Sequence, residues 1–388
     1  MRSTPTIHHS DLRVRVNVQA GRARRRPSLA AALAISVQVL VTALVLAAGA
    51  HRACALDPPE FHVDVAVEGK KYYRDGDLER GGYELDVDGF SIRFAGIEAF
   101  GCVGEGIEYS FEAATATCQP GRQIKLMEAG VFYRPSTLLR LGFAKGHMLR
   151  GFMAHECCIH MLTAEKPGFR QVFARCHPTG AVLDFDYSAN DAVRIEAQLA
   201  YLNGPAGTLD REHDFLFGLV LHTPVPGLSV CGHYSDVAMA LGAEPIPPYE
   251  TVYGSGYRTG FGVSLDSHNS KLRGEYYHGK AFQHDDPQES VIRPEDLEMT
   301  AFYFEGGYAI STGWDALRYV QPYAKYESWD KASNVDGDHR YSYLTGGVTL
   351  GLSEEQSMLR IDYMAPVSQP GGADDEAERL IVRLQTAL

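Results

Sequence analysis

The sequence predicts an all-β protein, a transmembrane antiparallel β-barrel of about sixteen strands, with eighteen as the alternative. Apolar and polar residues alternate with a period of two from residue 60 onward, which indicates strands with two unlike faces. The connections between these segments alternate in length, as they do when short periplasmic turns and long extracellular loops join barrel strands. An apolar segment of export type precedes the first strand.

The first 55 residues have the pattern of a cleaved signal peptide. Arginines cluster over 22–26, and a mostly apolar run over 29–50 follows them. The sequence Ala-Cys-Ala at 53–55 supplies the small-x-small site that a signal peptidase cuts, so we expect cleavage after Ala55 and a barrel domain over 56–388. A retained membrane anchor is the alternative, because a run of this length could span a bilayer.

The charge of the remaining domain excludes one class of partner. Of the 36 Lys and Arg and the 49 Asp and Glu, eight arginines and one aspartate fall within 1–55, which leaves 28 basic and 48 acidic residues. Nucleic-acid binding requires a basic surface, so we expect no nucleic-acid partner. Residues 56–388 also contain no apolar run long enough to span a bilayer as a helix, so a barrel is the remaining way to satisfy the backbone there.

Seventeen segments carry the alternating pattern. In 193–201, for example, Val, Ile, Ala, Leu and Tyr occupy every second position, with Arg, Glu, Gln and Ala between them. Because barrels of this kind have an even number of strands, we expect sixteen true strands among the candidates. The candidates are 60–67, 90–100, 105–114, 124–134, 137–145, 171–176, 180–187, 192–202, 214–223, 227–236, 256–266, 270–281, 297–311, 316–329, 340–352, 357–366 and 378–388.

The connections between candidates fall into two classes. The short ones include 135–136, 223–226 and 267–269. The long polar ones are 146–170, 203–213, 237–255, 282–296, 329–339 and 367–377. Tight turns on one rim and long loops on the other are typical of a membrane barrel.

Alternation alone does not decide whether the apolar residues face lipid or a protein core. The export segment and the strand lengths favour lipid, so the opposite parity would line a bore in which acids and bases nearly balance. Rings of charge can sort solutes by sign, whereas facing Arg and Glu can instead pair across strands and stiffen the wall. Both interpretations stay open. The channel-lining candidates are Arg93, Glu112, Lys125, Arg140, Arg194, Glu196, Arg258, Lys271, Arg273, Lys325, Arg360 and Arg383.

No sequence pattern predicts a metal or a cofactor. Of the seven cysteines six lie after residue 55, and an exported protein can form disulfides among them, although the sequence does not give their pairing. Cys157-Cys158-x-His160 and Cys176-His177 resemble metal ligands, but adjacent cysteines have the wrong spacing for a tetrahedral zinc site. The acidic loop over 330–338 lacks the spacing and the closing glutamate of a calcium loop.

Several segments of the predicted barrel carry a recognisable pattern. The residues Gly-Phe-Ser-Ile-Arg-Phe-Ala-Gly-Ile-Glu-Ala-Phe-Gly at 89–101 resemble the second strand of the phosphate-selective porin O and P family. Further similar segments follow in the family's order at 107–112, 126–133, 138–145, 178–204, 317–327 and 378–388. The resemblance implies a sixteen-stranded trimeric porin with a constriction loop at about 146–170. The resemblance supports a pore more strongly than it supports selectivity for phosphate, because the sequence has no lysine cluster to pass that anion.

These observations predict a porin of a Gram-negative outer membrane, through which small hydrophilic solutes and ions diffuse passively, with anions such as phosphate as one option. The expected partners are those solutes, the outer-membrane lipid and further copies of the chain in a homotrimer. An outer-membrane enzyme is the first alternative, but no Gly-x-Ser-x-Gly motif supplies a nucleophile, and we assign no catalytic residue. The second alternative is an exported soluble all-β binding protein, whose apolar faces would be buried at its centre.

Overall fold

The computed structural model describes the chain over most of the expected barrel domain. The described residues are 59–72, 89–103, 106–116, 124–155, 161–169, 173, 177–190, 193–203, 213–241, 252–280, 298–337, 339–353, 357–369 and 378–387. All of them belong to one compact unit, residues 50–388. The signal peptide expected over 1–55 lies outside the described residues.

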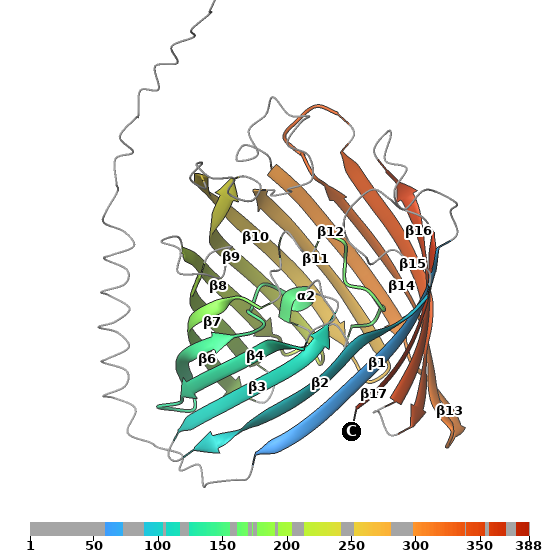
Figure 1. The fold of residues 1–388 in the computed structure, drawn as a ribbon, viewed down its shortest axis with the longest axis horizontal. Coiled ribbons are helices and arrows are strands. Elements are labelled where there is room, and N and C mark those ends of the chain that lie inside the picture. The colour runs from blue at the N-terminus through green and yellow to red at the C-terminus, as the bar shows by residue number, and fades with distance from the viewer. Residues whose placement is uncertain are drawn as a thin grey trace, which may run out of the picture. The chain divides into compact units, whose positions relative to one another are not determined.

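The described residues form seventeen strand segments and one short helix, and the strands run obliquely around a barrel (Figure 1). The helix is α2 (Phe152–His155). The strands are β1 (Glu60–Tyr72), β2 (Gly89–Val103), β3 (Ile107–Ala116), β4 (Lys125–Tyr133), β5 (Leu139–Lys145), β6 (Thr179–Asn190), β7 (Val193–Asn203), β8 (His213–His222), β9 (Leu228–Leu241), β10 (Val252–Asp266), β11 (Ser270–Lys280), β12 (Glu298–Tyr308), β13 (Ile310–Trp314), β14 (Leu317–Asp330), β15 (Arg340–Ser353), β16 (Ser357–Ser368) and β17 (Arg379–Ala387).

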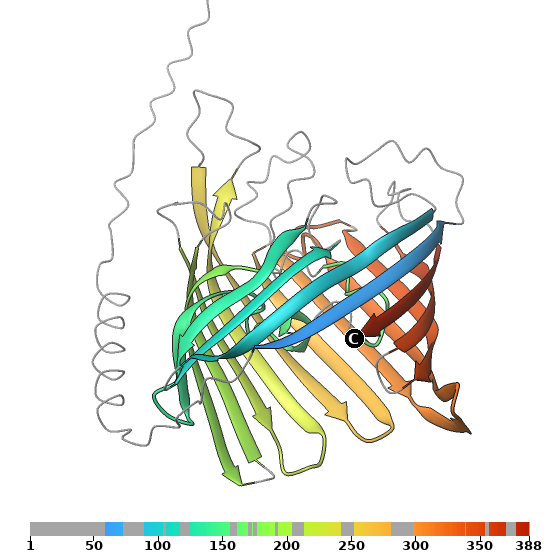
Figure 2. The ribbon, with the colours of Figure 1, turned by 60° about the horizontal axis from the view of Figure 1, so that its bottom comes forward.

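The strands close into a ring of sixteen positions. Each strand pairs antiparallel with the next, and β1 pairs with both β2 and β17, so the sheet has no free edge. Strands β12 and β13 share one position, because both pair with successive parts of β14. The prediction of a sixteen-stranded antiparallel barrel is therefore confirmed. Figure 2 shows the closure, with β1 lying between the blue-green start of the sheet and the red end.

One expected strand, at 171–176, does not belong to the ring. Strand β5 pairs directly with β6, with Leu139 opposite Phe185 and Lys145 opposite Thr179, which leaves no place between them for another strand. Within the expected strand the structure describes Phe173, which is in a helical turn and buried. The prediction of a strand was wrong here because a short apolar run has the same sequence pattern in a strand and in a segment packed inside a barrel.

The tight turns are built by residues that the sequence places between strands. At the turn from β8 to β9, Gly227 has a φ of 76°, and a Cβ at that position would lie 1.8 Å from the carbonyl oxygen of Asp266. The backbone N–H of Asp266 donates to the carbonyl oxygen of Gly227 at 2.9 Å. A glycine is thus required where one hairpin turn contacts the end of the neighbouring strand.

The faces of the barrel are inverted relative to a soluble protein. Along β8 exposed and buried positions alternate, and the exposed positions from Phe215 to Leu221 are all apolar. Strand β12 also has apolar residues on its exposed face and a charged residue on its buried face, because Phe302 and Phe304 are exposed while Glu305 is completely buried. Apolar side chains outside and charged side chains inside are the arrangement of a barrel in lipid. The described residues therefore form a transmembrane barrel, and their burial contradicts the soluble alternative.

A packed core nevertheless fills part of the interior. Met153, Phe169 and Phe173, from the chain between β5 and β6, pack against wall residues that include Tyr277, Tyr303, Trp329 and Tyr343. Among the described residues, no helix is long and apolar enough to cross a membrane.

The inversion predicts the effect of charge on the outer face. Phe261 on β10 is 62% exposed, and we expect Phe261→Arg to lower the free energy of unfolding in lipid by up to about 2–4 kcal/mol, because the guanidinium would enter hydrocarbon. Urea unfolding of the refolded barrel in lipid vesicles measures this difference. Phe261→Leu is the control and should unfold close to the wild type. Equal stability of the Arg variant would contradict the outward placement of this face.

Candidate functional site

The interior of the barrel is divided by one stretch of chain that folds inward. We call this stretch the inward segment and define it as the described residues 146–155, 161–169 and 173. It leaves the wall after β5, contains α2 and returns to the wall before β6; Figure 1 shows α2 inside the ring. Met148, Met153, Leu162 and Phe169 are among its buried side chains.

Wall residues hold the inward segment by its backbone. The carboxyl of Glu275 on β11 accepts hydrogen bonds from the N–H groups of Phe152 and Met153, both at 2.8 Å, and from the hydroxyls of Tyr277 at 2.9 Å and Tyr303 at 2.5 Å. Because a buried backbone N–H without a partner is costly, these contacts fix the path of the segment. Gly151 has a φ of 96°, and a Cβ there would lie 2.2 Å from Oε1 of Glu275, so the approach requires glycine.

Three other wall residues make equivalent contacts from different strands. Asp362 on β16 accepts from the N–H of Ala164 at 2.7 Å, and Glu327 on β14 accepts from the N–H of Gly168 at 3.2 Å. Gln198 on β7 accepts from the N–H of Leu149 at 2.8 Å. The segment is thus tied to both sides of the bore.

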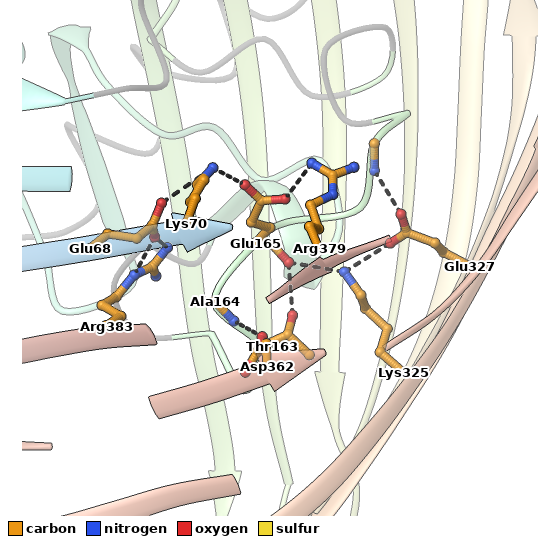
Figure 3. A network of polar contacts seen from close by, with 11 residues as sticks. Glu68, Lys70, Thr163, Ala164, Glu165, Lys325, Glu327, Asp362, Arg379 and Arg383 are labelled. Carbon is orange, nitrogen blue, oxygen red and sulfur yellow. Dashed lines mark hydrogen bonds and ion pairs between the residues drawn. The ribbon is translucent and has the colours of Figure 1, made fainter. Parts of the chain in front are cut away.

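Glu165 of the inward segment gathers basic residues of the wall (Figure 3). Its carboxylate contacts the ammonium of Lys70 at 2.5 Å and the guanidinium of Arg379 at 3.1 Å. Its carbonyl oxygen accepts a hydrogen bond from Lys325 at 2.9 Å. One acidic side chain therefore pairs with cations from the first and the last strand of the ring, β1 and β17, which lie side by side.

The basic residues under the segment are also paired with wall acids. Lys325 lies 2.8 Å from Glu327, and these side chains are 1% and 0% exposed. Arg383 donates through Nε to Glu68 at 2.9 Å, and both are buried. Arg383 and Glu68 are directly opposite in the register of β17 and β1, so this pair stiffens the wall across strands, whereas Lys325 and Glu327 lie on one strand.

The open space of the bore lies on the other side. A cavity of about 780 Å³ extends along the inner face of β1 to β8 and is bounded by residues 146–152 of the inward segment. The charged or titratable side chains that line it are Asp64, Glu98, Glu112, Glu128, Arg140, Lys145, His147, Asp184, Glu196, His222 and Arg273.

Carboxylates form a row across four neighbouring strands of this cavity. The register places Glu98 of β2 opposite Glu112 of β3, and Glu112 opposite Glu128 of β4. Asp64 of β1 lines the cavity beside them. We call Asp64, Glu98, Glu112 and Glu128 the acidic row. Like charges at directly paired positions repel one another across a sheet, so this row concentrates acidic groups on the cavity wall.

Farther round the same wall, acids and bases alternate and pair. Arg140 donates to Asp184 at 2.7 Å, and Arg194 donates to Asp186 at 2.7 Å. In the turn between β4 and β5, the Arg134 guanidinium donates to Glu108 at 2.5 Å. This hydrogen bond raises the pKa of Arg134 above its ordinary value, so the guanidinium stays charged.

The structure places the twelve channel-lining candidates in four groups. Glu112, Arg140, Glu196 and Arg273 line the cavity. Arg258, Lys325, Arg360 and Arg383 are buried inside the barrel. Arg194 lies at a smaller space of about 230 Å³ near the β6–β7 hairpin, and Lys271 shares the inward parity of Arg273 close to the β10–β11 turn. The side chains of Arg93 and Lys125 are outside the described part of the chain.

Of the acidic row, the channel-lining candidates from the sequence included only Glu112. Glu98 lies between the outward Ile97 and Ala99, so the period of two could have found it. Glu128 could not be found this way. The pairing of β3 with β4 shifts by one residue at Met127, which is buried, so the parity read from Leu126 gives the wrong face for Glu128.

The fold is similar to that of solved outer-membrane proteins. OmpF of Salmonella typhi in complex with daunomycin gives a TM-score of 0.58 at 11% identity and covers 87% of this chain and 100% of that chain. The anion-selective porin from Comamonas acidovorans gives 0.56 at 11% identity, covering 85% and 99%. The trimer form of OmpT from Vibrio cholerae gives 0.51 at 13% identity, covering 85% and 99%. No protein-family model and no curated protein sequence matches the chain.

Together the closed ring, the apolar outer face and these likenesses define the fold as an outer-membrane β-barrel of the porin type. Because the sequence identities are this low, the similarity to these structures shows the fold alone.

The anchoring by Glu275 predicts a large loss of stability on its removal. Glu275→Leu leaves four buried donors without their acceptor, and we expect the free energy of unfolding to fall by at least about 2 kcal/mol, since each unpaired buried donor costs about 1–3 kcal/mol. Glu108→Leu is the matched control at a half-exposed pair and should cost less than about 1 kcal/mol. Denaturant titrations of both variants in vesicles measure the two losses. Similar losses would mean that Glu275 does not hold the segment.

Proposed function

We propose that the chain is a porin of the outer membrane of a Gram-negative bacterium, through which small hydrophilic solutes and ions diffuse passively. The observation that carries this proposal is the charged cavity of about 780 Å³ inside a closed barrel with an apolar outer face. Passive diffusion needs no chemical step, no cofactor and no catalytic residue. The solutes themselves, and the lipid around the barrel, are the partners of this activity.

In this proposal the inward segment is the constriction expected at 146–170. It packs against β11 to β17 through its backbone and through Glu165, and thereby fills that side of the bore. Its residues 146–152 bound the remaining cavity along β1 to β8. Solutes would pass along the early strands and not along the late ones.

The charges around the cavity support a preference for cations. Six carboxylates line it, against Arg140, Lys145 and Arg273. Asp184 pairs with Arg140 and Glu196 pairs with Arg194, so the acidic row makes up the surplus. A surplus of one sign on the wall of a narrow aqueous path raises the local concentration of the opposite ion.

The phosphate option that the sequence resemblance suggested has less support. An anion path needs basic groups that face the solute, and on the late strands Lys325, Arg379 and Arg383 contact acids or carbonyl oxygens under the inward segment. We therefore propose a porin without extending the proposal to phosphate.

Removal of charge from the acidic row should change the selectivity. We expect the wild type to pass K⁺ in preference to Cl⁻. Glu98→Gln with Glu112→Gln should lower the permeability ratio by about twofold for each charge removed, as expected for a charge about 10 Å from an ion in water. Reversal potentials in planar bilayers under a KCl gradient measure this ratio. Asp315→Asn, in the exposed turn before β14, is the control and should leave it unchanged. An anion-preferring wild type would overturn the proposed selectivity.

We also propose that the chain is exported through its first 55 residues and assembles as a homotrimer. The trimer form of one structural neighbour supports the assembly by analogy of fold. The expected outcome for export is that intact-mass spectrometry of the protein from outer membranes gives an N-terminus at Leu56. A mass that includes residues 1–55 would support the retained anchor instead.

A further inference from the structure

Glu128, His147 and His177 meet at one point of the cavity wall. Each offers one ligand atom, and these atoms all lie within 4.8 Å of one another. Nδ1 of His147 lies 2.5 Å from Oε1 of Glu128, and the two imidazole rings have their centroids 4.7 Å apart. We call these three residues the His–Glu cluster.

The cluster lies at the root of the inward segment. His147 follows the end of β5 by two residues, and His177 precedes β6 by two. The backbone N–H of Gly146 donates to the carbonyl oxygen of Pro178 at 3.1 Å, which joins the two ends of the excursion. Glu128 belongs to the adjacent strand β4, so the cluster joins the wall to both ends of the segment.

The donor set suits a borderline transition metal. Two imidazole nitrogens and one carboxylate oxygen form a common zinc site with a fourth position open. Ligand atoms in a tetrahedral site lie about 2.1 Å from zinc and therefore about 3.4 Å from one another. Shifts of roughly 1 Å in the positions of the three side-chain atoms would give this spacing. All three residues are half-buried, and Glu128 and His147 line the cavity, so an ion can reach them from the water in the bore.

The contact between His147 and Glu128 can be replaced by an ion. An ion bound between Nδ1 of His147 and the carboxylate of Glu128 takes the place of the proton that these two atoms share at 2.5 Å, and the ring proton then lies on Nε2. Glu112, which pairs with Glu128 in the sheet, adds a second carboxyl group beside the cluster, which suits a divalent cation.

We propose that the His–Glu cluster is a binding site for one divalent transition-metal ion, with Zn²⁺ as the best match to its ligands. The bound ion would join β4 to both ends of the inward segment. It would also place two positive charges beside the acidic row and so lower the passage of cations. This second consequence rests on the proposed porin function, whereas the binding itself does not.

The test is a calorimetric titration of the purified, refolded full chain in detergent with Zn²⁺, after alkylation of its thiols so that cysteines bind no metal. The expected result is one saturable Zn²⁺ per chain. His147→Gln and His177→Gln should each weaken binding by about tenfold or more, because the loss even of a group that orients a ligand costs about 10–100-fold. His222→Gln is the matched control, since His222 also lines the cavity and lies 3.0 Å from a glutamate, Glu196. The affinity of the His222→Gln variant for Zn²⁺ should equal that of the wild type.

Several results would overturn the site. The wild type could bind no Zn²⁺ saturably, or a folded His147→Gln, His177→Gln double variant could retain the affinity. If the variants do not fold, the visible spectrum of Co²⁺ bound to the alkylated wild type decides, because tetrahedral nitrogen and oxygen ligands give strong d–d bands and an octahedral aqua ion does not. Zn²⁺ binding without any conductance in bilayers would contradict the porin and keep the site, while conductance without Zn²⁺ binding would do the reverse.

Discussion

The structure depends on one constraint, the pairing of every backbone N–H and C=O group where no water can reach. In hydrocarbon an unpaired group costs several kilocalories per mole, so a sheet is tolerated there only as a closed ring. The pairing of β1 with both β2 and β17 supplies that closure. Once the ring faces lipid, its apolar side chains must point outward, and the charged ones are left to share the interior.

The interior handles its charges in two different ways. Against β11 to β17 and the adjoining β1, the inward segment and Glu165 join the wall acids in neutralising Lys70, Lys325 and Arg379, and the space is packed. Along β1 to β4, the acidic row faces the cavity, with carboxylates in paired positions. The proposed cation preference and the proposed metal site both depend on this row.

Much of the fold could be predicted from the sequence, because a period of two is a local property that survives in each strand. The strand positions follow from it, whereas the number sixteen also required the rule of an even strand count, and the outward face required the export segment and the strand lengths. Three features could not be predicted. Phe173 has the pattern of a strand residue although it packs inside the ring, the shift at Met127 reverses the parity of β4, and the His–Glu cluster joins residues that the pairing of β4, β5 and β6 brings together. Each depends on pairing between distant segments, which one strand's pattern does not contain.

The inward segment has its root at a single place, between β5 and β6, yet it is tied to β7, β11, β14 and β16. It therefore braces the ring from within. Of the four wall acceptors that hold it, Glu275, Glu327 and Asp362 lie away from the cavity, and Gln198 lines it. Rigidity and discrimination thus fall largely on different strands of one ring, so the residues of the second can change in evolution with less effect on the first.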